Sequence, residues 1–148
     1  MGDTDRVARF VVSNGFEDLP PDVVDAAGTH VRDTLGVALA GTTRDVGEIA
    51  VDYVAANNPG TGATVVGSGT AAPVGAAFAN GVLAHALEWD DTPAGPHHLS
   101  HPSAPTLPAA LAAAELAEAS GAETLAGYVT GVEGLSRLEL ASFPGHYY

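Results

Sequence analysis

Residues 53–87 contain no Asp, Glu, Lys or Arg, and this uncharged stretch constrains the fold more than any other feature. It is not a membrane span, because Asn, Gly, Pro, Ser and Thr interrupt every apolar run before it is long enough. Its second half, from Pro73 to about Trp89, places apolar side chains on all sides of a helix. Such a helix is normally buried, so we expect it at the centre of the fold.

Further helical patterns flank this central helix. The sequence predicts helices over residues 3–14, 21–41, 44–57, 106–119 and 122–141, bounded mainly by Gly, Pro and Asn. Residues 63–67 are rich in β-branched side chains and are compatible with one short strand. The chain has 28 Ala and 18 Gly, and small side chains let helices approach closely. We therefore predict an all-α fold, a compact array of about six helices.

The charge balance excludes several classes of partner. The chain has 18 acidic residues and five basic ones, all Arg, which gives a net charge of −13. A nucleic-acid groove needs a basic stripe, and docking on an anionic membrane also needs positive charge, so we expect neither partner. An acidic surface without Lys suits a high-salt cytoplasm, where screening is strong, and is typical of halophilic proteins.

The absence of Cys excludes several structural features and catalytic mechanisms. Disulfides, thiolate nucleophiles, Cys-ligated zinc and iron–sulfur clusters are excluded. No nucleophile elbow, dinucleotide fingerprint or Lys-containing phosphate loop occurs, so we expect no cofactor. The first ten residues lack the apolar core of a signal peptide, and we expect a cytoplasmic protein.

Reactive side chains are concentrated between residues 88 and 103. If the central helix continues far enough, Glu88, Asp91 and Thr92 share one face where it opens into a loop. A carboxylate at that position suits general acid–base chemistry. His101 precedes Pro102, which holds its backbone extended and suits a positioned base. The plainer alternative is a solvated helix end followed by a surface turn.

The same region raises the question of a metal. Possible ligands are Asp90, Asp91, His97, His98 and His101. Their spacing matches no recognised cage, so we predict no metal. His85 lies within the central helix and is interpreted as a core histidine. Asn80 is buried by pattern and must find hydrogen-bond partners, which would either orient the loop or tie helices together.

Several segments resemble, in the same order, the MmgE/PrpD family. They are residues 31–41, 63–67, 79–92 and 101–109, and the most specific part is the pair Asp90-Asp91-Thr92 and His101-Pro102-Ser103. The family includes 2-methylcitrate dehydratase, cis-aconitate decarboxylase and iminodisuccinate epimerase. The resemblance implies an all-helical first domain, a second α+β domain, dimers, and a metal-free site that moves a proton beside a carboxylate of a small di- or tricarboxylate.

The resemblance also implies roles for individual residues. The family's catalytic acidic position falls on Glu88, where Asp is usual, its site threonine on Thr92, and its proton-carrying histidine on His101. We assign Asp91 and Asn80 to substrate binding beside them.

Family members are several hundred residues long, so residues 1–148 correspond to the N-terminal part of the helical domain. A tricarboxylate needs cations to hold it, and four of the five Arg precede residue 45. We therefore expect a truncated or split lyase that dehydrates a hydroxy-tricarboxylate such as 2-methylcitrate once a homodimer partner or a complementing second chain completes it. The alternative is a non-catalytic helical dimerisation module, or a relic of such an enzyme.

Overall fold

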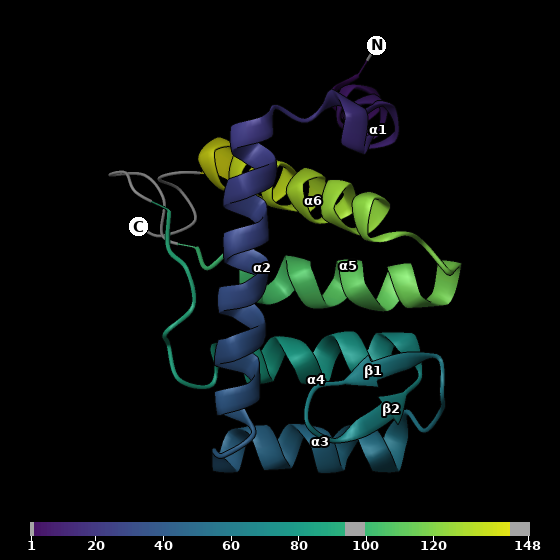
Figure 1. Cartoon of the computed structure of the whole chain (residues 1–148), viewed down its shortest axis with the longest axis vertical. Coiled ribbons are helices and arrows are strands. Elements are labelled where there is room, and N and C mark those ends of the chain that lie inside the picture. Colours follow the sequence, from purple (N-terminus) through teal and green to yellow (C-terminus); the bar gives the residue numbers. More distant parts are fainter. Residues whose placement is uncertain (1, 94–99, 143–148) are drawn as a thin grey trace.

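The computed structural model describes residues 2–93 and 100–142 (Figure 1). Within these ranges there are six α-helices, one short 3-10 helix and a two-stranded hairpin. The elements are α1 (Asp3–Ser13), η1 (Phe16–Asp18), α2 (Pro21–Gly41), α3 (Asp45–Asn57), β1 (Ala63–Val65), β2 (Gly69–Ala71), α4 (Pro73–His85), α5 (Ser103–Ala117) and α6 (Gly121–Ser142). The predicted all-α class is confirmed. Among the described residues, no helix is both long and apolar enough to cross a membrane.

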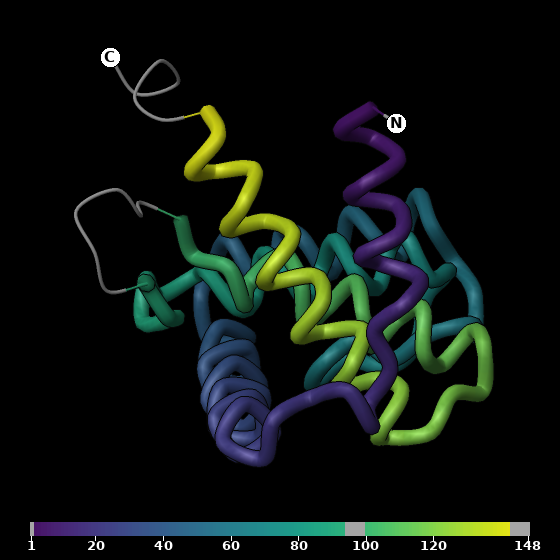
Figure 2. The backbone as a smooth tube through the Cα atoms, turned by 90° about the horizontal axis from the view of Figure 1, so that it is seen from above, coloured from purple at the N-terminus to yellow at the C-terminus, as the bar shows by residue number. Residues whose placement is uncertain are grey.

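Helices α3, α4, α5 and α6 lie side by side as a layer, and the long α2 crosses them (Figure 1). Helix α4 is central, since it contacts α2, α3, α5 and both strands. Its Ala76, Ala79, Leu83 and Ala84 have no exposed surface. Viewed from above, α1 lies beside α6 (Figure 2), and the two helices are in contact. The prediction of a buried central helix therefore holds for α4, although its Val74 and Phe78 remain exposed.

Glycine sets the distance between α2, α3 and α4. A β-carbon added to Gly41 would collide with the backbone carbonyl of Leu83, and one added to Gly47 would collide with the carbonyl of Gly41. The chain can turn from α2 into α3 against α4 only because these two positions have no side chain. This packing fixes the C-terminal end of α4, which carries His85.

The hairpin extends the predicted strand. β1 pairs with β2 in antiparallel register, with Ala63 opposite Ala71 and Val65 opposite Gly69. The second strand was not predicted, because its Gly-Thr-Ala sequence lacks the run of β-branched residues that marks β1. Asn80 of α4 fastens the hairpin in place. Its Oδ1 accepts the N–H of Val66 and its Nδ2 donates to the carbonyl of Thr64, both at 2.8 Å.

The predicted end of the central helix was wrong. Helix α4 ends at His85, four residues before Trp89. Beyond it, the Ala86 N–H donates to the carbonyl of Leu83 and the Glu88 N–H to that of His85, both three residues back. Glu88 then adopts a left-handed conformation with φ +52°. A helix cannot pass through such a residue, so Glu88, Asp91 and Thr92 do not share a helical face.

Two other helix starts lie earlier than predicted. α5 begins at Ser103, and the Asp91 carboxylate accepts the Ser103 N–H, one of the first-turn donors that has no partner within the helix. Gly121 begins α6 instead of separating two helices. Glu123 accepts the backbone N–H and the hydroxyl of Ser120, and the Ser120 hydroxyl accepts the Glu123 N–H. This reciprocal box lowers the pKa of Glu123, with the backbone hydrogen bond as the largest cause.

Candidate active site

A cavity of about 670 Å³ opens where α4 ends. Its described lining comes from α3, α4, the turn after α4, the loop before α5 and the start of α5. The residues are Val46, Ala77, Phe78, Gly81, Val82, His85, Ala86, Glu88, His101, Ala104 and Pro105. Apolar walls with His85, Glu88 and His101 as the ionisable groups are typical of a small-molecule site.

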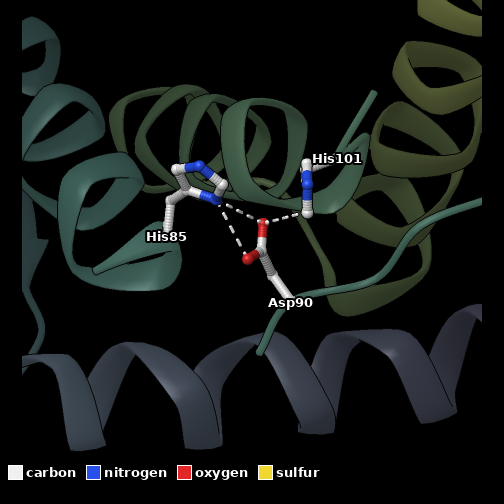
Figure 3. A group of neighbouring side chains, drawn as sticks. All are labelled: His85, Asp90 and His101. Carbon is white, nitrogen blue, oxygen red and sulfur yellow. Dashed lines mark hydrogen bonds and ion pairs between the residues drawn. The ribbon is translucent and has the colours of Figure 1, made fainter. Parts of the chain in front are cut away.

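The buried carboxylate of Asp90 organises two of these groups (Figure 3). Its side chain has no exposed surface. Nδ1 of His85 lies 3.0 Å from each carboxylate oxygen, and Nδ1 of His101 lies 3.2 Å from Oδ2. The His101 contact is close enough for an ion pair, yet its N–H is not aligned as a hydrogen bond. One acidic side chain thus lies between the histidine at the end of α4 and the histidine before α5.

The two imidazole rings also contact each other. Their centroids are 4.7 Å apart and their planes are inclined by 64°, an edge-to-face arrangement. The side chain of His85 is 48% exposed and that of His101 is 32% exposed. Because Nδ1 of each ring lies toward the buried Asp90, Nε2 lies on the far side of the ring and is the atom available for chemistry.

The neighbouring Asp91 serves a different part of the fold. Its Oδ1 accepts the Ser103 N–H at 3.1 Å and its Oδ2 accepts the Ser103 hydroxyl at 2.6 Å. Nδ1 of His30 lies 3.4 Å from the same Oδ2. A carboxylate at the N-terminus of α5 is favoured by the exposed N–H groups there. Asp91 is therefore engaged in holding α5 and α2.

The Asp91–Ser103 pair continues to Tyr128 of α6. The Ser103 hydroxyl and the Tyr128 hydroxyl are within hydrogen-bond distance, and both residues are buried. Burial raises the pKa of Tyr128, the hydrogen bond with Ser103 lowers it, and the negative charge of Asp91 raises it further. This chain of contacts ties α6 to the loop that carries the site.

The structure brings together only part of the predicted site. Glu88 and His101 line the same cavity. Thr92 is exposed and lies outside the described lining of that cavity. The amide of Asn80 is engaged by the hairpin, as described above. His97 and His98, named as possible metal ligands, lie outside the described residues.

Two residues of this cluster were not recognised from the sequence. His85 was interpreted as a core histidine, but it is half exposed and lines the cavity, so that interpretation was wrong. Asp90 was considered only as a metal ligand. Their pairing depends on the left-handed turn at Glu88, which brings Asp90 back against the end of α4. The available signal was a His and an Asp five residues apart at the end of an apolar helix.

The cluster also has the composition of a metal site. Donor atoms of His85, Asp90 and His101 lie within 4.8 Å of one another, and imidazole with carboxylate suits several divalent transition metals. However, the 3.0 Å contact of His85 with Asp90 is an ordinary hydrogen-bond distance that requires no ion between the two groups, and Nδ1 of His101 lies within ion-pair distance of the same carboxylate.

Besides the two histidines, the described cavity lining contains the acidic Glu88 and no Arg. An anionic substrate would therefore need positive groups from elsewhere.

The chain is similar to known proteins over most of its length. The chain matches the family model described as the MmgE/PrpD N-terminal domain over residues 5–148. It is 34% identical over 122 residues to human cis-aconitate decarboxylase, covering 78% of this chain and 25% of that protein. It is 33% identical over 141 residues to the mouse enzyme of the same name, covering 91% of this chain and 28% of that protein. The chain spans about a quarter of the length of these relatives, and it belongs to the MmgE/PrpD family.

Proposed function

We propose that this chain forms one side of the active site of an MmgE/PrpD-type lyase. In that site a proton is transferred at a carbon beside a carboxylate group of a small di- or tricarboxylate. The observation that carries the proposal is the shared cavity of His101 and Glu88, with Nδ1 of His101 beside the buried Asp90. The family match and the two relatives named cis-aconitate decarboxylase support the same class of reaction.

Each residue has a defined chemical task in this proposal. His101 uses Nε2 to take or give the proton, because its Nδ1 lies toward Asp90. Glu88 lies on the same cavity and orients the substrate or relays the proton. Thr92 donates a hydrogen bond to a substrate carboxylate that reaches the exposed turn after Glu88. No step in this scheme uses a metal or a cofactor.

Two reactions fit these tasks. In dehydration of a hydroxy-tricarboxylate such as 2-methylcitrate, a base removes the proton from one carbon while hydroxide leaves the next carbon with an added proton, as water. In decarboxylation of cis-aconitate, CO₂ leaves and an acid delivers a proton to carbon. The names of the two mammalian relatives favour the second reaction. Both reactions require a group that changes its protonation state beside the reacting carbon, and in this proposal that group is the imidazole of His101.

The remaining parts of the site are also proposals. A tricarboxylate carries several negative charges, and the described cavity lining adds the carboxylate of Glu88 without an Arg. We infer that the cations come from the remainder of the enzyme, either on a second copy or on a complementing chain. The cytoplasmic location and adaptation to high salt belong to this proposal and rest on composition.

Proton transfer can be tested directly. The chain, alone and together with the polypeptide that completes it, is incubated in D₂O with 2-methylcitrate and with cis-aconitate. Proton NMR then follows product formation and deuterium incorporation beside the carboxylate. We expect turnover of one of these compounds only with the completed enzyme. If the completed enzyme converts neither compound and incorporates no deuterium, the lyase assignment is wrong and the non-catalytic dimerisation module or relic becomes the better description.

A further inference from the structure

We propose that Asp90 is a positioning residue that holds His85 and His101 in the Nδ1-protonated tautomer. Both imidazoles, which line the cavity, then keep Nε2 unprotonated. The catalytic consequence rests on the proposed function, whereas the arrangement of protons does not. The inference starts from a carboxylate with no exposed surface that lies between two histidines.

Because Asp90 is buried, its carboxylate oxygens need hydrogen-bond donors close to them. An ionised carboxylate can only accept hydrogen bonds, and a buried one is stable only when its oxygens have donors nearby. His85 provides one, since its Nδ1 lies 3.0 Å from both oxygens. Nδ1 of His101 lies 3.2 Å from Oδ2, within ion-pair distance, although its N–H is not aligned as a hydrogen bond. Among residues 2–93 and 100–142, the imidazole nitrogens found beside this carboxylate are the Nδ1 atoms of these two rings.

The tautomer follows from this requirement. A neutral imidazole has a single N–H, on either Nδ1 or Nε2. If the proton were on Nε2, the lone pair of Nδ1 would face the lone pairs of the carboxylate at about 3 Å, which is repulsive. Protonation at Nδ1 replaces that repulsion by attraction. The Asp90 carboxylate thus decides which nitrogen of each ring remains unprotonated.

His101 depends on Asp90 in particular. Its Nδ1 is buried and has no aligned hydrogen-bond partner among the described residues, and Oδ2 of Asp90 is the acceptor beside it. Without Asp90, Nδ1 of His101 would have no acceptor there, and the ring would be free to choose its tautomer.

The chain supplies a matched control at the next position. Asp91 is also a poorly exposed aspartate, but its oxygens accept hydrogen bonds from Ser103 and lie near His30. Replacing Asp91 by Asn therefore tests the effect of removing a carboxylate charge beside the site without touching the His85–Asp90–His101 cluster. An Asn at position 90 is the informative change, because it offers one acceptor and one donor where Asp offers two acceptors.

The test is the tautomeric state itself. Long-range ¹H–¹⁵N NMR of the ¹⁵N-histidine-labelled chain distinguishes Nδ1–H from Nε2–H at a pH where the imidazoles are neutral. His85→Gln and His101→Gln assign the two signals. We expect both rings to be Nδ1-protonated in the wild type and in Asp91→Asn. In Asp90→Asn at least one ring should change to the Nε2–H form, because the amide group donates to its Nδ1.

Three experimental results would overturn the proposed role of Asp90. An Nε2–H signal from either ring in the wild type would overturn the proposal without any variant, so it remains testable even if Asp90→Asn does not fold. Unchanged tautomers in a folded Asp90→Asn would also overturn it. Stoichiometric binding of Zn²⁺ or Co²⁺ that is lost in both His85→Gln and Asp90→Asn would replace it by a metal site.

The catalytic consequence has a separate test. In the completed enzyme, Asp90→Asn should lower kcat by about a hundredfold or more with a smaller change in KM, because the base is in the wrong tautomer. Asp52→Asn, at an exposed aspartate of α3 outside the described cavity lining, should leave kcat near the wild-type value. Correct tautomers in an enzyme without turnover would contradict the proposed function but leave the positioning role of Asp90 intact, so the two failures can be told apart.

Discussion

His85 and His101 meet edge to face, with ring centroids 4.7 Å apart, beside the carboxylate that they share (Figure 3). The two residues come from different elements, the last residue of α4 and the loop before α5. Their meeting depends on the close contact of α4 with α5 and on the left-handed turn at Glu88. The candidate site is therefore a property of one helix end and the turn that follows it.

The Asp91–Ser103–Tyr128 contacts should be important for stability. Ser103→Ala removes the hydroxyl that donates to Asp91 and contacts Tyr128, both at poorly exposed positions. We expect the free energy of unfolding to fall by about 1–3 kcal/mol, because two polar groups lose their partner. Denaturant titration measures this loss. Ser68→Ala, at an exposed turn position, should change stability by less than about 0.5 kcal/mol. Equal effects of the two variants would contradict this account.

Tyr128 should make stability sensitive to alkaline pH. Its folded-state pKa is raised above the ordinary value of 10.0, chiefly by burial. The unfolded chain then loses this proton at a lower pH than the folded chain, so the contribution is complete below about pH 10 and is lost as pH rises further.

Unfolding free energies measured across this alkaline range should decline more steeply in the wild type than in Tyr128→Phe. Tyr53→Phe, at a half-exposed position, serves as the control and should keep the wild-type slope. Identical slopes in all three proteins would show that burial of Tyr128 does not control its ionisation.

Glu118, like Glu88, has a left-handed backbone conformation, which is strained for a residue that has a β-carbon. Glu118 is the residue after α5, with φ +53°, and its side chain is exposed. Gly adopts this conformation without the steric penalty of a β-carbon, so Glu118→Gly should stabilise the protein by about 0.5–1 kcal/mol. Glu118→Ala keeps the β-carbon and should give no such gain. Calorimetric melting of the two variants measures the difference, and a lower Tm for Gly than for Ala would refute the explanation.

Much of the fold could be predicted from residues that begin or end helices and from the periodicity of the apolar residues. Pro21, Gly41 and Asn57 bound α2 and α3 within a residue or two of the predicted positions. The end of α4 could not be predicted, because Glu88 takes a left-handed conformation that the sequence signals only when Gly or Asn is present. The strand β2 was missed for a similar reason, since pairing with β1 and not its own propensity makes it a strand.

The candidate site could also be predicted only in part from the sequence. His101 and Glu88 were identified from a resemblance and from their chemistry, and they line one cavity. Asp90 and His85 were not, because their role depends on a contact made after the helix ends. Asn80 looked like a site residue because it is a buried amide, but its partners are backbone groups of the hairpin. Local pattern reveals which polar residues are buried, and tertiary structure decides what they face.

The central claim is that His101 carries the proton, and a pair of matched variants tests it most directly. Turnover of cis-aconitate and of 2-methylcitrate is measured in the completed enzyme for wild type, His101→Gln and His30→Gln, the last lying outside the described cavity lining. We predict a loss in kcat of about 10²–10⁴-fold for His101→Gln, as for removal of a general acid or base, and near wild-type turnover for His30→Gln. Full activity of a folded His101→Gln enzyme would contradict the account.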